Sequence, residues 1–263
     1  MLILLPPSEG KAAPSRRGRP TRTETLTFPE LTATREAIRE ALIRASAGAD
    51  ALEVLGVSPG LAAEVARNRD LADLPARPAM EIYTGVLYDA LDFAGLSPTG
   101  RRRAARSLLV QSALWGPVGP RDRIAPYRLS MGTTLPGIGP LARAWRAVLD
   151  PVLSEAVGTG VLVDCRSSTY AAAWQPPVDV ARRCVAVRVF TEEAGRRTVV
   201  SHQAKHTRGL VARWLLESPS LPKRPEHVAA VVAAHARCVL VDLGRKGHVL
   251  DVIQPPLRQA QGA

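Results

Sequence analysis

A polar cluster stands behind the first apolar run of the chain. Leu2–Leu5 has the length and composition of a buried strand, and two prolines end it before Ser8, Glu9 and Lys11. Ligand groups in α/β proteins gather at the carboxyl ends of strands, so these three side chains are candidate catalytic groups, and Lys11 is also a candidate phosphate ligand. The phosphate loop of nucleoside triphosphatases is excluded, because that loop needs Ser or Thr where Ala12 stands.

A second set of cations lies where a predicted strand runs into a helix. Lys205 and Arg208 share one helix face, and Arg213 follows about a turn later. Cations near a helix N-terminus oppose the helix dipole unless an anion lies there, which predicts a phosphate site; a solvated helix face is the alternative. His202 and His206 have the spacing of metal ligands, but no neighbouring carboxylate completes a set, so we predict no metal site.

A third polar group follows the predicted strand at 161–164. Asp164 at its end is a candidate catalytic carboxylate, and Arg166 is a candidate phosphate ligand. Ser167 could act as a nucleophile, but nothing in the sequence identifies its base, and a capped helix start is the favoured interpretation. We therefore expect Ser167 and Tyr170 to line a cleft.

The segment 52–65 resembles a helix-hairpin-helix element. A helix is followed by a glycine-hydrophobic-small turn and by a second helix that opens at a proline. A turn of this kind points backbone N–H groups at one phosphate and binds DNA without reading its sequence. Gly56 and Gly60 would supply the permissive backbone, while Ser58 replaces the second glycine. Two helices packed through a Gly-Pro turn would look the same, so a packing role is the alternative.

The remaining pattern predicts a mixed α/β domain. Strands interleave with helices, and two antiparallel hairpins add α+β character. We predict a single compact domain over 1–263 with an unusual topology, into which a helical subdomain at 28–75 is set. The expected strands are 2–5, 108–110 and 161–164, with hairpins at 185–200 and 239–252; the expected helices are 29–47, 51–55, 61–69, 141–157, 204–217 and 225–236.

The composition predicts a folded protein with affinity for polyanions. The chain has 263 residues, 46% of them hydrophobic, and a formal net charge of +11. No apolar run approaches the about 20 residues of a membrane span, and no basic region precedes Leu2–Leu5, so we expect neither a signal peptide nor a membrane partner. Three scattered cysteines favour a reducing cytoplasm over a disulfide framework. No motif indicates a cofactor.

Several blocks, taken in order, resemble the YaaA peroxide-stress family. They are Tyr83-Thr84-Gly85, Ser112-Ala113-Leu114-Trp115-Gly116, Pro126-Tyr127-Arg128-Leu129-Ser130-Met131-Gly132, Ser167 through Tyr170, Ala204-Lys205, Arg208-Gly209-Leu210 and Arg213. The resemblance implies a single-domain α/β fold of unusual topology with a helix-hairpin-helix and a positively charged cleft. It also implies DNA binding and a role in limiting damage by free iron and peroxide. One departure is Glu9, which stands where the familiar branch has lysine, so the ligand of this chain is expected to differ.

Two functions from different classes follow. The first is a cytoplasmic protein of oxidative-stress defence that binds DNA without strong sequence preference. The second is an enzyme acting on a nucleic-acid or small phosphorylated ligand in the same cleft. Both predict one concave, electropositive site. Its expected members are the candidate catalytic residues Ser8, Glu9, Lys11, Asp164 and Lys205, the phosphate ligands Arg128, Arg166, Arg208 and Arg213, and the cleft-lining residues Tyr83, Tyr127, Ser167, Tyr170 and His202.

Overall fold

The computed structural model describes residues 1–193, 196–198 and 201–254. Its main sheet has eight strands in the order β11-β12-β9-β8-β1-β3-β4, with β10 paired to β9. Parallel pairs join β3, β1, β8, β9 and β12 in turn, and the other pairs are antiparallel, which confirms the mixed α/β class. The strands are β1 (Leu2–Leu5), β3 (Leu108–Ser112), β4 (Gly116–Val118), β8 (Leu162–Asp164), β9 (Cys184–Glu193), β10 (Arg196–Thr198), β11 (Cys238–Asp242) and β12 (His248–Gln254).

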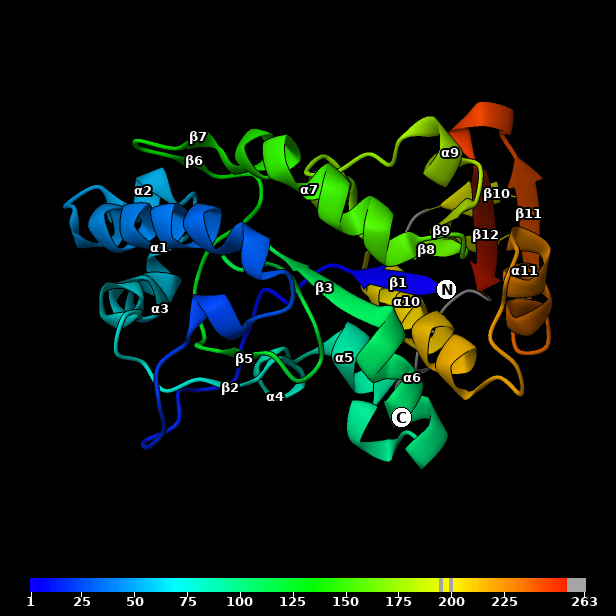
Figure 1. Cartoon of the computed structure of the whole chain (residues 1–263), viewed down its shortest axis with the longest axis horizontal. Helices are drawn as coiled ribbons and strands as arrows, with labels where there is room; N and C mark the ends of the chain where they lie inside the picture. The colour runs from blue at the N-terminus through cyan, green and yellow to red at the C-terminus, as the bar shows by residue number, and fades with distance from the viewer. Residues whose placement is uncertain (194–195, 199–200, 255–263) are drawn as a thin grey trace.

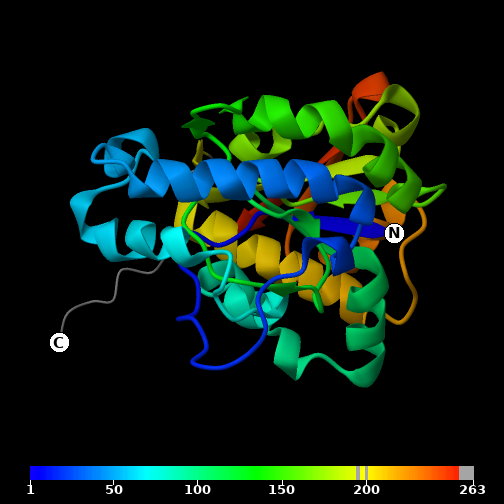
Figure 2. The ribbon, with the colours of Figure 1, turned by 60° about the vertical axis from the view of Figure 1, so that its left-hand side comes forward.

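Helices cover both faces of this sheet. The helices α7 and α10 lie on opposite sides of β1 (Figures 1 and 2), and α10 packs along α5. Two small ribbons, β2 (Arg77–Pro78) with β5 (Arg123–Ile124) and β6 (Thr134–Leu135) with β7 (Gly139–Pro140), stand apart. The helices are α1 (Thr32–Ala47), α2 (Ala51–Val54), α3 (Ala62–Arg67), α4 (Ala79–Ile82), α5 (Val86–Leu91), α6 (Pro98–Ser107), α7 (Leu141–Val157), α8 (Ser168–Ala171), α9 (Val178–Ala181), α10 (Ser201–Glu217) and α11 (Pro225–Ala233).

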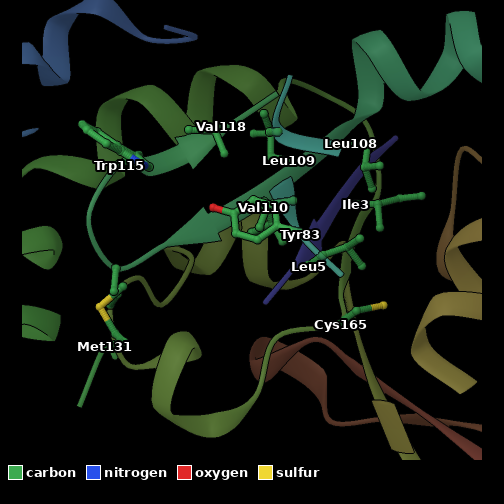
Figure 3. Close-up of a cluster of buried hydrophobic side chains, with 14 of the residues drawn as sticks. Ile3, Leu5, Tyr83, Leu108, Leu109, Val110, Trp115, Val118, Met131 and Cys165 are labelled. Carbon is green, nitrogen blue, oxygen red and sulfur yellow. The ribbon is translucent and has the colours of Figure 1, made fainter. Parts of the chain in front are cut away.

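The centre of the core lies between β1 and β3. Every residue of both strands is buried, because helices cover the sheet on each face and no side chain can turn to water. Figure 3 shows Ile3 and Leu5 of β1 beside Leu108 and Val110 of β3. This explains why these strands appear in the sequence as continuous apolar runs. Their burial fixes the loops that leave their ends.

Most predicted elements are present with adjusted ends. The helix at 141–157 has the predicted bounds, and both hairpins form. The helix at 61–69 is shorter, because 3-10 turns replace its first and last residues. The prolines in residues 116–127 favour a long loop, but this stretch contains β4 and β5. The predicted residues Gly195, Val199 and Val200 of the first hairpin lie outside the described part of the chain.

The predicted helical subdomain corresponds to α1, α2 and α3. These helices lie together at the left-hand end of the molecule in Figure 1, beyond the edge of the main sheet. Buried apolar residues of α1 and α3, among them Ile38, Leu42 and Val65, belong to the same core cluster as the sheet. The helices α1–α3 therefore share one core with the rest of the domain.

Arg35 on α1 is the main polar group inside this region. Its side chain is fully buried and donates hydrogen bonds to backbone carbonyl oxygens alone in the described structure. An arginine has five N–H donors in a rigid fork, and here all of the partners come from two separate loops. The side chain therefore holds the entry to α1 against the loop after β3. The acceptors are the carbonyls of Thr23, Thr27, Phe28, Trp115 and Pro117.

None of the helices in the described residues is both long and apolar enough to span a bilayer.

Candidate functional site

A cavity of about 580 Å³ lies beside the carboxyl end of β1. We call it the basic cavity. Six stretches of chain line it: the loop after β1, the turn after α2, the start of α5, a loop at 128–130, the residues around the start of α8, and α10. The lining residues are Pro6–Lys11, Leu55–Val57, Thr84–Tyr88, Arg128–Ser130, Ser167, Thr169, Tyr170, Lys205 and Arg208.

The basic cavity brings together most of the predicted site. Among its lining residues are Ser8, Glu9, Lys11, Arg128, Lys205 and Arg208, which are separated by up to 200 positions in the sequence. Part of the reason is topological: β1 pairs in parallel with β8, so the loop after β1 and the residues that follow β8 leave the sheet at the same edge. The loop at 128–130 and the helix α10 complete the wall. The prediction of one shared site holds for these six residues.

The loop after β1 is fixed by contacts from two other segments. The Tyr88 hydroxyl donates to the Pro6 carbonyl at 2.7 Å, and the Thr84 backbone N–H donates to the Ser8 hydroxyl at 3.2 Å. Arg128 Nη1 donates to the Glu9 carbonyl at 3.1 Å. Because these contacts come from both the start of α5 and the loop at 128–130, the loop after β1 is held in one conformation before any ligand binds.

Lys11 has a strongly perturbed environment in the cavity wall. Its Nζ donates to the carbonyls of Ser8 at 2.9 Å and Glu9 at 3.3 Å, and it lies 4.3 Å from the centre of the Tyr127 ring. Burial, together with the positive charge of Arg128, lowers the pKa of Lys11 to about 7, although the Glu64 and Glu9 carboxylates oppose this change. A large fraction of this amine is therefore neutral at physiological pH.

Tyrosines form the floor beneath Lys11. The Tyr127 hydroxyl lies 2.7 Å from the Ser112 hydroxyl and 3.4 Å from the Tyr83 hydroxyl. Burial raises the pKa of Tyr83, Tyr127 and Tyr170 above the ordinary value, so all three keep their protons. Tyr170 lines the cavity as predicted, whereas Tyr83 and Tyr127 are buried below it.

The cations of the wall differ in how they are paired. Lys205 Nζ lies 3.3 Å from a Glu9 carboxylate oxygen, and both side chains are exposed. Arg128 lies 3.6 Å from a Glu64 carboxylate oxygen. Arg208 lines the same cavity, and its buried Nε has no hydrogen-bond partner within the described part of the chain. Of the four basic side chains in the wall, Arg208 alone makes no hydrogen bond or salt bridge within the described residues, which leaves its guanidinium as the candidate to take an anion.

Asp164 and Arg166 are paired with each other below the cavity. Arg166 donates to the Asp164 carboxylate through Nε at 2.9 Å and through Nη2 at 2.7 Å, and its Nη2 also donates to the Trp174 carbonyl. Burial alone would raise the pKa of Asp164, but the Arg166 guanidinium brings it below its ordinary value. The Arg166 side chain is fully buried, so the structure places it away from the predicted phosphate site and gives it a structural ion pair.

Two other predicted residues, Arg213 and His202, lie outside the cavity wall. Arg213 donates to the carbonyls of Leu91 and Asp92 and lies 3.0 Å from the Asp92 carboxylate, so it caps the C-terminal end of α5. His202, at the exposed start of α10, is absent from the lining. Across the described residues, no group of three or more His, Cys, Asp or Glu side chains could hold a metal ion.

The turn after α2 reaches the cavity through Gly56. This glycine has φ 61°, a left-handed conformation that favours glycine, and nothing lies within 4 Å of the position of its missing Cβ. The N–H groups of Gly56 and Val57 donate to the carbonyls of Glu53 and Leu52, so the turn closes on itself. Gly60 has no positive φ and lies outside the wall. The hairpin interpretation of this segment stays a prediction, with the turn serving as one wall of the cavity.

Several lining groups were not among the predicted site residues. Thr84, Ser130 and Thr169 add hydroxyl groups to the wall, and Glu64 of α3 pairs with Arg128. The three hydroxyl residues lie inside the sequence blocks that carry the family resemblance, which was the available signal. No sequence pattern pointed to Glu64, because its pairing with Arg128 depends on how α3 packs beside the loop at 128–130.

The lowered pKa of Lys11 predicts a pH-dependent stability effect. The amine has a pKa of about 7 in the folded protein and 10.5 as the ordinary value, so between these pH values the unfolded chain binds more protons and stability rises with pH. Lys11→Met removes the cost of burying the charge. We expect the variant to be about 1–3 kcal/mol more stable than the parent at pH 7 and below, with the difference vanishing near pH 10. Urea unfolding at pH 6.5, 8 and 10 measures it; a difference independent of pH would contradict this assignment.

Known proteins resemble this chain over most of its length. A family model described as peroxide stress protein YaaA matches residues 1–231. A UPF0246 protein of Streptomyces coelicolor is 55% identical over 227 residues, which cover 86% of each chain. A UPF0246 protein of Corynebacterium efficiens is 39% identical over 249 residues, which cover 94% of this chain and 97% of the relative.

A UPF0246 protein of Corynebacterium glutamicum is 38% identical over 239 residues, 89% of this chain and 92% of its own. The family match includes every segment that lines the basic cavity, from the loop after β1 to Arg208 on α10. The resemblance expected from the sequence blocks is therefore confirmed: the chain belongs to the YaaA family of peroxide stress proteins, whose relatives here carry the name UPF0246.

Proposed function

We propose that this protein binds DNA without strong sequence preference, through backbone phosphates that enter the basic cavity. The observation that carries the proposal is Arg208, a cation in the cavity wall whose buried Nε has no partner in the described structure. Lys205 lies on the same helix, and Arg128 faces the cavity from another segment. Guanidinium and ammonium groups gathered in a concave site are typical of phosphate recognition.

The charge balance supports this choice of ligand. Four cationic side chains and one carboxylate, Glu9, line the cavity of a protein with a formal net charge of +11. Such a site attracts polyanions over several ångströms and does so less strongly as salt rises. The contacts would be made to phosphates and sugars, which position DNA without reading its bases.

The size of the cavity limits which part of a DNA duplex can enter it. A volume of about 580 Å³ suits a nucleotide-sized group and excludes a whole duplex. The duplex would therefore lie across the mouth, with one or two phosphates and a sugar directed inward. In peroxide stress, a protein bound in this way limits damage by free iron at the DNA itself.

The proposal is tested by replacing the unpartnered cation. Arg208→Ala should lower the affinity for duplex DNA about five- to tenfold and reduce the slope of log affinity against log salt by about one, as expected for one lost phosphate contact. Arg106→Ala, an exposed site on α6 outside the cavity, removes the same charge and should leave the slope nearly unchanged. Fluorescence anisotropy at several salt concentrations measures both. Equal effects of the two substitutions would show that only bulk charge matters.

A second substitution tests the wall formed by the turn after α2. Gly56→Val forces a β-branched residue into a left-handed conformation, so the turn must rearrange, and DNA affinity should fall about threefold or more. Gly137→Val is the matched control, because Gly137 also has a positive φ and open space but lies in the β6–β7 turn outside the cavity wall. A folded Gly56 variant that binds as tightly as the control variant would remove the turn from the binding surface.

A second candidate function is an enzyme acting on a nucleic-acid or phosphorylated substrate in the same cavity. Lys11 favours it, because a buried amine with a pKa near 7 is a stronger nucleophile than an ordinary lysine. Phosphate binding alone gains nothing from a neutral amine, which carries no charge.

A further inference from the structure

We propose that Lys11 forms an imine with the open-chain aldehyde of an abasic deoxyribose in DNA bound at the basic cavity. This inference rests on the proposed function and names the damaged sugar that the cavity accepts. Three observations lead to it: the position of the Lys11 amine, the cations around it, and the room beside it.

The amine is presented in one place by the surrounding structure. Lys11 Nζ donates to the Ser8 and Glu9 carbonyls, at 2.9 and 3.3 Å, and the loop that carries those carbonyls is fixed by Tyr88, Thr84 and Arg128. A neutral amine has two N–H donors for these two acceptors and keeps its lone pair for an electrophile. The charged and titratable groups facing it are Arg128, Glu64, Glu9, Tyr83 and Tyr127.

The cations select a phosphorylated electrophile. Arg208 and Lys205 on α10 and Arg128 on the opposite loop line the same cavity as the amine. An abasic site has a C1′ aldehyde between two backbone phosphates. Its phosphates can therefore pair with the cations while its aldehyde meets the Lys11 amine. Lacking a base, it also needs less room and is more easily turned out of the helix than an intact nucleotide. Radical attack on DNA in peroxide stress generates such sugars.

The step balances with one proton taken from solvent. The Lys11 lone pair attacks C1′, a proton passes from the attacking nitrogen to the aldehyde oxygen, and the product is a neutral carbinolamine. Its hydroxyl group takes up a solvent proton and leaves as water while the nitrogen lone pair forms the C=N bond, and the nitrogen keeps one proton in the resulting iminium ion. No electrons are gained or lost, so the step needs neither an oxidant nor a reductant.

Reductive trapping tests the inference. The full chain is mixed with a duplex oligonucleotide that contains one abasic site, and with cyanoborohydride, which reduces the imine to a stable amine. We expect a covalent protein–DNA band whose peptide map places the modification on Lys11, one of four lysines in the chain with Lys205, Lys223 and Lys246. An undamaged duplex should give no band. The yield should be about tenfold higher at pH 8 than at pH 6, because the amine is mostly neutral only above pH 7.

Variants separate the amine from the charge. Lys11→Arg keeps a cation and lacks a nucleophilic amine, so the fraction of bound duplex that is trapped should fall at least 50-fold. Lys246→Arg, in the hairpin between β11 and β12, should trap like the parent. Circular dichroism checks that each variant is folded; if Lys11→Arg is not, Lys11→Met serves in its place. Modification spread evenly over the lysines or placed on the Met1 amine would overturn the inference.

A small aldehyde distinguishes failure of the inference from failure of the proposed function. The same trapping is done with 2-deoxyribose 5-phosphate, and binding of undamaged duplex is measured by anisotropy. Duplex binding with no Lys11 adduct on either aldehyde overturns the imine and leaves the proposed function standing. A Lys11 adduct on the sugar phosphate, without any duplex binding, overturns DNA as the substrate together with the proposed function. Adducts on both aldehydes, with duplex binding, support both.

Discussion

Arg35→Met should lower the free energy of unfolding by about 3–5 kcal/mol. The substitution leaves buried backbone carbonyls of two loops without donors, because the Arg35 side chain is fully buried and bonds only to such carbonyls in the described structure. Burial lowers the pKa of Arg35 to about 10, which leaves the guanidinium charged at pH 7. Urea unfolding monitored by circular dichroism at pH 7 measures the loss.

Arg44→Met is the matched control for this effect. Arg44 lies on the same helix with an exposed side chain, 3.8 Å from the Glu40 carboxylate, and such surface pairs contribute about 0–1 kcal/mol. A similar small loss for both variants would mean that water replaces the guanidinium of Arg35 at little cost. That outcome would contradict a role for Arg35 in holding α1 to the sheet.

The double variant Lys205→Ala with Arg208→Ala should lose DNA affinity about 30- to 100-fold at low salt. The two cations lie on one helix face and both line the basic cavity, so their removal should reduce the salt slope by about two. The loss should shrink as salt rises, because the missing term is the release of counterions from the DNA. Anisotropy over a salt series, with unrelated duplex sequences as ligands, gives both quantities.

Two exposed arginines of α6 provide the comparison for the double variant. Arg102→Ala with Arg106→Ala removes the same formal charge from a surface outside the cavity and should change affinity less than threefold. If the α6 pair matters as much as the α10 pair, DNA lies on another face of the protein and the basic cavity serves a different ligand.

The fold was predictable where the spacing of apolar residues is compatible with only one type of secondary structure. The apolar runs at Leu2–Leu5 and 108–110 became the central parallel strands, and the helix at 141–157 has its predicted bounds. Residues 116–127 show no strand pattern in the sequence, because Pro117 lies within the short strand β4 and Pro120 lies between β4 and β5. The order of the strands in the sheet could not be predicted from the sequence, since it depends on contacts between segments far apart in the chain.

The site was predictable where residues end strands or open a helix. Ser8, Glu9 and Lys11 behind β1 meet Lys205 and Arg208 on α10 in one cavity, as expected. Residue type alone could not show which arginines would form ion pairs or hydrogen bonds inside the protein. Arg166 pairs with Asp164 and Arg213 caps α5, and both pairings depend on side-chain neighbours that only the folded chain defines.

The lowered pKa of Lys11 was equally hidden in the sequence. Lys11 lies in a polar cluster of the sequence, but its pKa is lowered by burial against Tyr127 and by Arg128, more than 100 residues away. A lysine in the same loop exposed to water would have an ordinary amine. Burial by distant segments therefore decides how much of this amine is charged at pH 7.

The most direct test of the central claim is the affinity of the unmodified protein for duplex DNA as a function of salt. DNA binding through phosphates in the basic cavity predicts a linear fall of log affinity with log salt concentration and nearly equal affinities for two duplexes of unrelated sequence. Inorganic phosphate at high concentration should compete. Absence of binding at the lowest salt concentration, or an affinity that does not change with salt, would contradict the account.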